Sequence, residues 1–343
     1  MDELIIPGLP EELGLECLAR LHYKTRPIAS RACRRWLDLL ESHQFYCLRK
    51  QLGYTNQIAC LLQSLPPPPP EEESRKPTSS VSPASCELTM FDPVSREWDR
   101  LPPVPKYTNG LPLFCQIASS EGKLVLMGGW DPVSFESLSS VFVYDFSTNR
   151  WRQGKDMPSR RSFFAIAAKG CRVFIAGGHD SSKKALDTAW AYDVMKDEWT
   201  ELTRMSQERD ECEGIVIGDE FWVISGYKTE FQGAFEGSVE LYNIGTGEWR
   251  RVESGWKQGE WPRSTCPRLG KDGKLASWTE LDSAVSGTAC GVILGEKSLV
   301  MGSAHQGAPL GFFMVSEQDG KLERMNVPYE FSGFVQSSCC VDV

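Results

Sequence analysis

The chain has 343 residues, of which 41% are hydrophobic, 10% aromatic and 24% charged, enough apolar material for one large domain or one large and one small. No run of about 18 apolar residues occurs, which excludes a membrane-spanning helix, and the acidic start MDELIIPGLPEEL is no signal peptide, so we expect a protein of the cytosol or nucleus that has no membrane partner. The net charge is −9, with an acidic body that argues against nucleic acid as a partner, because such binding depends on basic residues that meet phosphates.

Residues 1–50 have the spacing of short helices. Pro10 followed by two glutamates indicates a helix start, and apolar residues then recur every three or four positions as far as Leu21. Pro27 marks a break or a new start, and a second helix is expected over residues 30–45. So few residues cannot build a stable core alone, so this module should bury apolar surface on the rest of the chain or on a partner. Its basic residues are predicted to form a solvated face: Lys24, Arg26, Arg31, Arg34 and Arg35.

The next region predicts two strands with an insertion between them. QIACLL (57–62) and CELTMF (86–91) have the composition of strands. Residues 64–85 between them are rich in proline and serine and almost without large apolar residues. We therefore expect a disordered insertion between two strands of one sheet.

Four segments then repeat one pattern, in which tryptophan follows an acidic or amide residue by six positions. The segments are Phe91-Asp92-x5-Trp98, Tyr144-Asp145-x5-Trp151, Tyr192-Asp193-x5-Trp199 and Tyr242-Asn243-x5-Trp249. A second marker recurs between them: Gly128-Gly129, Gly177-Gly178 and Ser225-Gly226. Each unit of about 50 residues predicts four short strands, and such a small sheet must stack on its neighbours. Radial stacking gives a β-propeller, with the tryptophans between blades and the glycines at positive φ or close approaches.

The pattern shortens after Trp249. KLASWTE (274–280) and SLVMGSA (298–304) resemble the same strand of two units but lie only half a period apart, which indicates a truncated blade. Residues 311–328 predict a last hairpin, and residues 333–343 a final apolar stretch. The first blade lacks its first two strands, so the C-terminal strands are expected to supply them and close the ring. Six blades with the fifth truncated are favoured, and five is the alternative.

Cysteine and histidine give no chemical site. The twelve cysteines form no C-x-x-C and no cluster with histidine, whereas structural zinc needs four ligands, so we predict mostly buried thiols, no metal and no cofactor. No G-x-S-x-G, H-E-x-x-H or phosphate-binding loop occurs. Only two histidines fall among the repeats, too few for a copper radical oxidase, and nothing selects a sialidase site. The chain is therefore predicted not to be an enzyme.

Two resemblances follow from these motifs. The pattern Leu9-Pro10-x2-Leu13-x4-Leu18-x2-Leu21, then Cys33-x2-Trp36-x2-Leu39-Leu40-x4-Phe45, resembles the F-box, and the repeats resemble kelch repeats. The expected fold is therefore mainly β: an F-box helical module over 1–50 and a kelch β-propeller over 51–343. The order of the two is similar to plant F-box/kelch proteins. The stretches IPGLPEELGLECLARL and FSGFVQSSCCVDV resemble the subgroup that controls turnover of phenylalanine ammonia-lyase and of type-B cytokinin response regulators.

The resemblance implies a non-catalytic substrate-recognition subunit of a Skp–cullin–F-box ubiquitin ligase. Its partners would be a Skp-type adaptor, a cullin scaffold reached through that adaptor, and a protein substrate, the lyase and the response regulators being candidates. Its contribution would be proximity, which raises the effective concentration of the target lysine. The alternative is a kelch scaffold without a ligase role. The adaptor contacts implied by the F-box motif are Leu9, Pro10, Leu13, Leu18, Leu21, Cys33, Trp36, Leu40 and Phe45.

One rim of the propeller is predicted to bind the substrate. In a four-stranded antiparallel blade, the link between the second and third strands and the link into the next blade emerge on the same face. Loops on a rigid scaffold concentrate binding residues, and arginine and aromatic side chains are favoured at interfaces. The predicted substrate-binding residues follow the glycine markers or the tryptophan segments: Trp130, Asp131, Arg160, Arg161, His179, Asp180, Arg209, Tyr227, Arg263 and His305.

Overall fold

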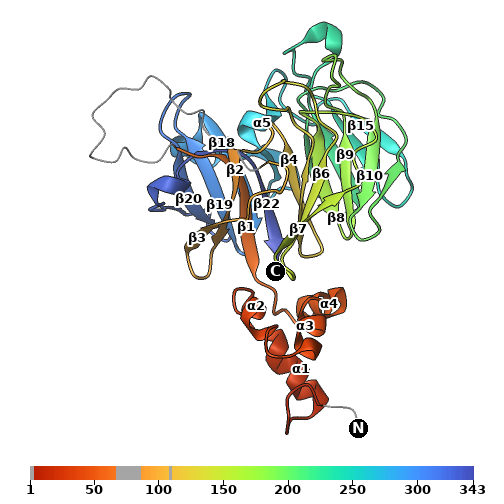
Figure 1. The fold of residues 1–343 in the computed structure, drawn as a ribbon. Helices are drawn as coiled ribbons and strands as arrows, with labels where there is room; N and C mark the ends of the chain where they lie inside the picture. The colour runs from red at the N-terminus through yellow and green to blue at the C-terminus, as the bar shows by residue number, and fades with distance from the viewer. Residues whose placement is uncertain (1–3, 67–85, 108–109) are drawn as a thin grey trace, which may run out of the picture.

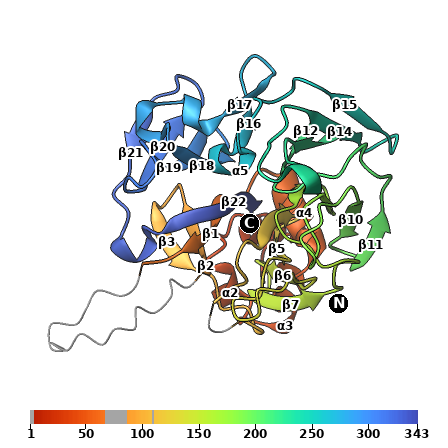
Figure 2. The same ribbon diagram turned by 90° about the horizontal axis from the view of Figure 1, so that it is seen from above.

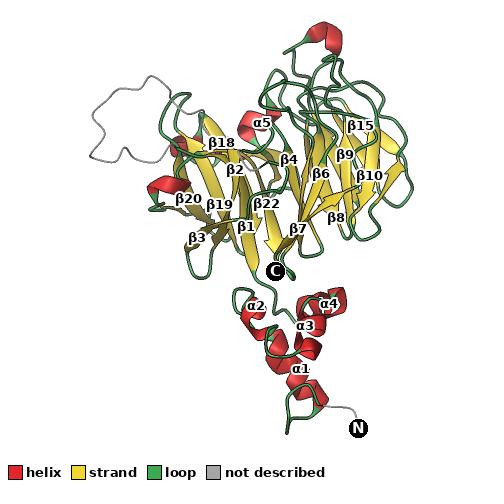
Figure 3. Ribbon diagram, in the orientation of Figure 1, coloured by secondary structure: helices red, strands yellow, loops and turns green. Residues whose placement is uncertain are grey.

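A ring of small antiparallel sheets stands on a helical module (Figure 1). The computed structural model describes residues 4–66, 86–107 and 110–343. Its sheets are arranged around a central axis, as the view from above shows (Figure 2). Among the described residues beyond the first 51, strands are the main regular structure (Figure 3). Among the described helices, none has the length and apolar character needed to cross a membrane.

The N-terminal module contains four short helices rather than the two that we expected. The predicted start at Pro10 is confirmed, and the second predicted helix is divided at Ser42, whose hydroxyl accepts the amide hydrogen of Phe45 at 3.2 Å and so caps a new helix. Pro27 lies in the first turn of another short helix. The helices are α1 (Glu11–Ala19), α2 (Arg26–Ala29), α3 (Arg34–Leu40) and α4 (His43–Gln51).

This module has a small core of its own. Buried side chains from the start of the chain, α1, α3 and α4 pack together, with Trp36 partly buried against them. Arg49 lies inside, where its guanidinium donates to the carbonyl oxygens of Ala19, Leu21 and Tyr54 at 2.6–3.2 Å. The buried members of this core are Ile5, Leu18, Ala19, Leu40 and Phe45.

The first blade closes the ring. Its strand order is β22-β1-β2-β3, so the C-terminal strand pairs with β1, with Ala59 opposite Cys340. Our expectation of two C-terminal strands was wrong, because residues 57–64 already form the second strand of this blade and only the innermost one is missing. From residue 67 to residue 85, the predicted disordered insertion lies outside the part of the chain that the structure describes. The four strands are β1 (Gln57–Ser64), β2 (Cys86–Asp92), β3 (Glu97–Arg100) and β22 (Phe334–Asp342).

The next three blades are complete and regular, as the repeats predict. Each is a four-stranded antiparallel sheet, and the innermost strands β22, β4, β8 and β12 are neighbours around the axis. The second blade has β4 (Gln116–Ser120), β5 (Lys123–Met127), β6 (Val141–Asp145) and β7 (Arg150–Gly154). The third has β8 (Ala165–Lys169), β9 (Arg172–Ala176), β10 (Ala189–Asp193) and β11 (Glu198–Glu201). The fourth has β12 (Glu213–Ile217), β13 (Glu220–Ile224), β14 (Val239–Asn243) and β15 (Trp249–Val252), with the 3-10 turn η1 (Thr229–Phe231) between β13 and β14.

The fifth position of the ring holds only a hairpin. In the described part of the chain there are thus five four-stranded sheets and one two-stranded sheet, which agrees with the half-period seen in the sequence. The hairpin is preceded by α5 (Pro262–Thr265) and consists of β16 (Pro267–Leu269) and β17 (Leu275–Ser277), followed by η2 (Trp278–Glu280) and η3 (Ser283–Val285). The last blade has β18 (Thr288–Leu294), β19 (Lys297–Ser303), β20 (Gly311–Ser316) and β21 (Leu322–Arg324), and η4 (Tyr329–Phe331) leads into β22.

The tryptophans lie between blades, as predicted. In three of the repeats the indole N–H donates to a backbone carbonyl in the segment that leaves the preceding blade. The indole N–H of Trp151, for example, donates to the carbonyl oxygen of Pro102 at 2.8 Å. Trp98 instead packs edge-on against Phe312, with ring centroids 5.5 Å apart, where the first blade meets the last blade. The acid of the motif caps the turn that leads to the tryptophan, since Asp193 accepts the backbone N–H groups of Met195 and Lys196.

The second glycine of each marker is required by a close approach of backbone. A Cβ at Gly178 would lie 2.4 Å from the carbonyl oxygen of Ser162, and the residue has φ +78°. Gly129 and Gly226 have the same conformation and meet the backbone of their own blades in the same way. The repeated glycine therefore holds each second strand against the chain segment that enters its blade.

Candidate functional site

The helical module lies against one face of the propeller, the face that carries the hairpin turns of the first two blades (Figure 1). Lys24 pairs with Glu97 at 2.7 Å, and the hydroxyl of Ser147 donates to the carbonyl of Glu41 at 3.3 Å. Residues just before β1 and at the end of β22 exchange two backbone hydrogen bonds at the same joint. The opposite face, which carries the links between blades, stays free of the module.

The implied adaptor contacts divide into a buried and an exposed set. Leu18, Leu40 and Phe45 belong to the module's core, so their role is to hold the helices together and not to present a side chain. Leu13 is 49% exposed, and Pro10 and Cys33 are also exposed. Leu9, Leu21 and Trp36 are partly exposed. The exposed apolar residues outside the motif include Ile28 and Leu37, which are 69% and 37% exposed.

A cavity of about 130 Å³ opens at the mouth of the central channel, on the face opposite the helical module. Its walls come from the links that enter the blades and from the first residues of innermost strands. Most of them are apolar. The residues that line it include Phe114, Phe163, Trp261, Arg263, Cys290 and Phe334.

Four rings form an aromatic cluster beside this cavity, namely Phe114, Trp130, Phe163 and His179. Phe163 lies at its centre, with ring centroids 4.5–5.5 Å from the other three. Lys183 covers Trp130 with its ammonium group 5.4 Å from the ring centroid. An apolar surface with one cation above it is suited to hold a protein ligand.

The two phenylalanines have an uncommon backbone conformation. Phe114 and Phe163 both have φ +56°, and Glu211, at the equivalent position of the next blade, has φ +51°. A bulky residue in this region costs on the order of 1–3 kcal/mol, and such strain gathers at functional sites. We overlooked both residues in the sequence, although each stands 14 positions before the first residue of its marker, as does Glu211.

Two of the predicted rim arginines are structural. Arg161 and Arg209 are fully buried, so the expectation that they bind substrate was wrong. Arg161 donates to the carbonyls of Gly177 and Thr188, and burial lowers the pKa of its guanidinium to about 10. Arg209 bonds equivalent carbonyls one blade on and pairs with the buried Glu240 at 3.1 Å. Each of these two arginines holds the segment that enters a blade against the strands of that blade.

The other predicted rim residues share the face but not one function. Asp131 caps its own turn, and the backbone N–H groups of Ser134 and Val133 lower the pKa of its carboxyl. In the next blade, Asp180 likewise accepts the backbone N–H groups of Ser182 and Lys184 in its own turn. Tyr227 is buried and donates to Glu211 at 2.9 Å. Arg160, paired with Glu136 at 3.1 Å, and His305 are exposed on the rim.

Ser162, His179 and Asp210 have the connectivity of a hydrolase triad. The serine hydroxyl lies 2.9 Å from His179 Nε2, and Nδ1 lies 2.9 Å from the Asp210 carboxylate. A nucleophile must be reached by its substrate, however, and Ser162 has no exposed surface. The network therefore serves to hold two of the connecting segments together, and through His179 it is continuous with the aromatic cluster.

Arg263 crosses the mouth between blades. Its Nη2 donates to the carbonyls of Phe164 and Cys212 at 2.5 and 2.8 Å, its guanidinium covers Phe163, and its Nε is buried without a protein partner. Glu213 lies 3.9 Å away, and burial raises the pKa of that carboxyl. The mouth thus offers a positive charge beside apolar walls.

Comparison with known families matches both modules. Residues 6–48 match the F-box domain, and residues 77–268 match the KLHDC2/KLHL20/DRC7 Kelch-repeats domain. Three Arabidopsis thaliana proteins are similar. F-box/kelch-repeat proteins At2g44130 and At1g80440 are each 38% identical, over 74% and 71% of this chain and 66% and 68% of their own lengths. F-box/kelch-repeat protein At1g15670 is 33% identical over 99% of both chains.

Proposed function

Because the chain belongs to the plant F-box/kelch-repeat proteins, whose two modules mark substrate-recognition subunits of Skp–cullin–F-box ubiquitin ligases, we propose that each of its modules binds a different partner. The F-box binds the Skp-type adaptor, and through it the cullin. The mouth of the propeller binds the protein to be ubiquitinated. The chain supplies proximity and performs no bond chemistry.

The adaptor surface is the exposed apolar side of the F-box. Pro10, Leu13, Ile28 and Leu37 leave apolar area in water that a partner would cover. Scattered exposed apolar residues are ordinary, but several on one small module favour an interface. The buried core beneath them keeps the four helices in a fixed arrangement.

The substrate surface is the aromatic mouth. Phe114 and Trp261 are exposed and offer ring faces, and Phe163, only 8% exposed, packs against Phe114. Arg263 and Lys183 offer positive charge. This combination favours a segment with an apolar or aromatic anchor next to an acidic group or a carbonyl. Interfaces of this kind concentrate their energy in a few buried aromatic and arginine contacts.

The placement of the two surfaces on opposite faces of the ring carries this proposal (Figure 1). A substrate seated at the mouth is not obstructed by an adaptor bound to the F-box. The joint between the modules, with its ion pairs and backbone hydrogen bonds, favours a constant distance between them. Constant distance is what proximity catalysis requires.

The finer identity of the substrate rests on resemblance. Phenylalanine ammonia-lyase and type-B cytokinin response regulators are the proposed candidates, which would give the chain a role in phenylpropanoid metabolism or in cytokinin signalling. The proposed compartment is the cytosol or the nucleus, where both ligase and substrates would meet.

Co-purification with a Skp-type adaptor tests the proposal. A Leu9→Ala/Pro10→Ala double variant and Leu13→Arg should lose a complex that the natural sequence forms in equal stoichiometry. Leu52→Arg is the matched control, because Leu52 is 45% exposed on the same module and follows α4 near the propeller. If the natural sequence forms no complex, the chain is a kelch scaffold without a ligase role.

A further inference from the structure

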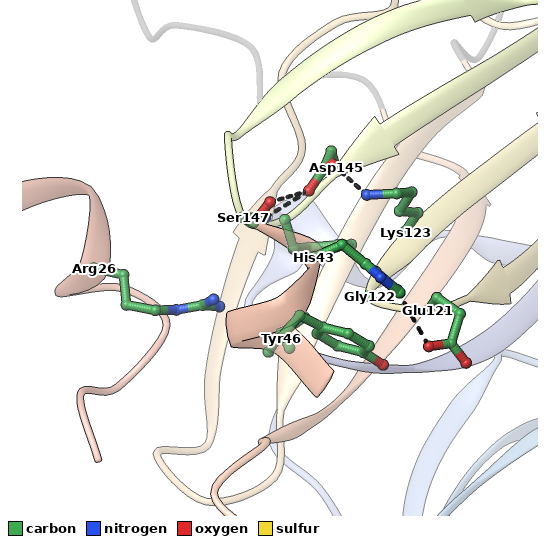
Figure 4. A pocket seen from close by; sticks show the side chains of 10 residues that line it. Arg26, His43, Tyr46, Glu121, Gly122, Lys123, Asp145 and Ser147 are labelled. Atoms are coloured by element: carbon green, nitrogen blue, oxygen red, sulfur yellow. Dashed lines mark hydrogen bonds and ion pairs between the residues drawn. The ribbon is translucent and has the colours of Figure 1, made fainter. Parts of the chain in front are cut away.

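The joint between the F-box and the propeller brings together three side chains of the kinds that bind zinc. His43 and Cys47 lie one helical turn apart on α4, and Glu121 projects toward them from the turn between β4 and β5. Figure 4 shows His43 and Glu121 facing each other across the joint. We propose that these residues bind a divalent transition-metal ion, zinc by preference, that fastens the F-box to the second blade.

The distance between the imidazole and the carboxylate fits a single ion. Cys47 Sγ lies 3.7 Å from both His43 Nδ1 and His43 Nε2, and Nε2 lies 3.5 Å from Glu121 Oε2. Around tetrahedral zinc, a sulfur and a nitrogen ligand are about 3.6 Å apart, and a nitrogen and an oxygen ligand about 3.4 Å, given the usual bond lengths. The imidazole and the carboxylate therefore already have the separation that a bound ion imposes. The sulfur lies beside the ring, at equal distance from its two nitrogens, so binding requires the exposed Cys47 side chain to turn toward the ion.

The neighbouring residues fix two of the three ligands. Tyr46 is buried, and its ring stacks on His43 with centroids 5.9 Å apart and an interplanar angle of 25°. The same ring fills the space beside Gly122, where a Cβ would lie 2.6 Å from it. Glu121 itself has φ +48° and a side chain only 16% exposed. One tyrosine thus holds both the imidazole and the turn that carries the carboxylate.

Lys50 competes with the ion for Glu121, and this gives the site a distinctive property. Its ammonium lies 3.4 Å from Oε1, whereas His43 faces Oε2. A cation at the site is repelled by the ammonium group, so removal of Lys50 should tighten metal binding.

Three protein ligands leave a fourth position for water, on the side where Cys47 is exposed. Binding would convert the thiol to a thiolate and release its proton. The ion would add a coordinate link between modules that are now joined by hydrogen bonds and ion pairs. The inference concerns the joint alone and does not depend on the ligase role.

Cobalt(II) is the probe, because thiolate coordination gives it a charge-transfer band in the near ultraviolet. The full chain is purified with chelator and then titrated with cobalt(II). One thiolate–cobalt band should appear and saturate at one ion per chain, and added zinc should remove it. Cys47→Ser should abolish the band, Glu121→Gln should weaken binding at least tenfold, and Lys50→Ala should strengthen it. Cys33→Ser, which changes another exposed thiol of the same module, should leave the band intact.

Thermal unfolding gives a second readout. Zinc should raise the melting temperature of the natural sequence but not that of Cys47→Ser, since a ligand that binds only the folded state stabilises it. The proposal is overturned if no thiolate band forms, if Cys47→Ser and Cys33→Ser behave alike, or if Lys50→Ala weakens binding. In any of these cases the cluster is a hydrogen-bonded ion pair only.

Discussion

The rings of Phe114 and Phe163 lie 4.5 Å apart at the mouth of the channel, although they belong to the entrances of different blades. Both residues have φ +56°, so the same strained backbone aims both rings at one place. Phe114 is 36% exposed, and its ring packs against Trp130 and Phe163. Glu211 has φ +51° at the equivalent position of the next blade, so the conformation belongs to the repeat, and we interpret the two aromatic rings that it carries here as the binding feature.

This interpretation predicts a separation of stability from binding at Phe114. Phe114→Gly should be more stable than Phe114→Ala by about 1 kcal/mol, because glycine accepts positive φ without strain. Both variants should lose substrate binding, since both lack the ring. Chemical denaturation of the two variants, together with capture of partner proteins, measures both quantities. Equal stability of the two variants would contradict the claim that the position is strained.

Gly178 and Gly170 form a matched pair for the role of the repeated glycine. Both have positive φ, but a Cβ at Gly170 meets nothing within 4 Å, whereas at Gly178 it would lie 2.4 Å from a backbone oxygen. Gly170→Ala should cost about 1 kcal/mol from backbone strain alone. Gly178→Ala should cost at least twice that, because the backbone of the link must also move. Similar losses in urea denaturation would show that close approach is unimportant there.

Breaking the ion pair between Arg209 and Glu240 should be severely destabilising. Both side chains have no exposed surface, so Glu240→Gln leaves a buried guanidinium without its carboxylate, at a cost of about 3–5 kcal/mol. Glu323→Gln removes the acid of an exposed pair with Arg96 and should leave the melting temperature unchanged. A small loss of stability in Glu240→Gln would mean that the hydrogen bonds from Arg209 to carbonyl oxygens are enough to stabilise the buried guanidinium.

The repetitive part of the fold follows from the sequence because its determinants are local. The acid and the tryptophan of each repeat are joined by one turn, and Asp193 caps that turn while Trp199 lies opposite Tyr192 in the same hairpin. Counting such units therefore counts blades. The shortened interval after Trp249 marks the hairpin β16–β17 for the same reason.

The candidate sites follow less well because they depend on distant contacts. The sequence places Arg161 and Arg209 on the correct links, but only the tertiary structure shows that their guanidinium groups are enclosed by the next strands. Trp261 and Phe334 reach the mouth from irregular segments outside the repeat. Glu121 approaches His43 only because the F-box folds back on the second blade, so no spacing of residues reveals that cluster.

Asp145 should make the joint sensitive to acid. Burial alone would raise its pKa, but hydrogen bonds from Lys123 and Ser147 outweigh burial, and the pKa of Asp145 is lowered. A lowered pKa in the folded state contributes stability above the ordinary aspartate pKa of about 3.9, and this contribution is lost as the pH falls below it. Asp145→Asn should therefore flatten the fall in melting temperature on acidification. An unchanged slope would assign that fall to other carboxylates.

The central claim is that the F-box and the propeller mouth are separate surfaces with separate partners. We would express the full chain with a Skp-type adaptor, block the proteasome, and identify what co-purifies with Leu13→Arg, Phe163→Ala and the natural sequence. Leu13→Arg should lose the adaptor and keep the partner proteins captured by the mouth, and Phe163→Ala should do the reverse. If either variant loses both classes of partner while it remains folded, or if neither loses any, the division of the two surfaces is wrong.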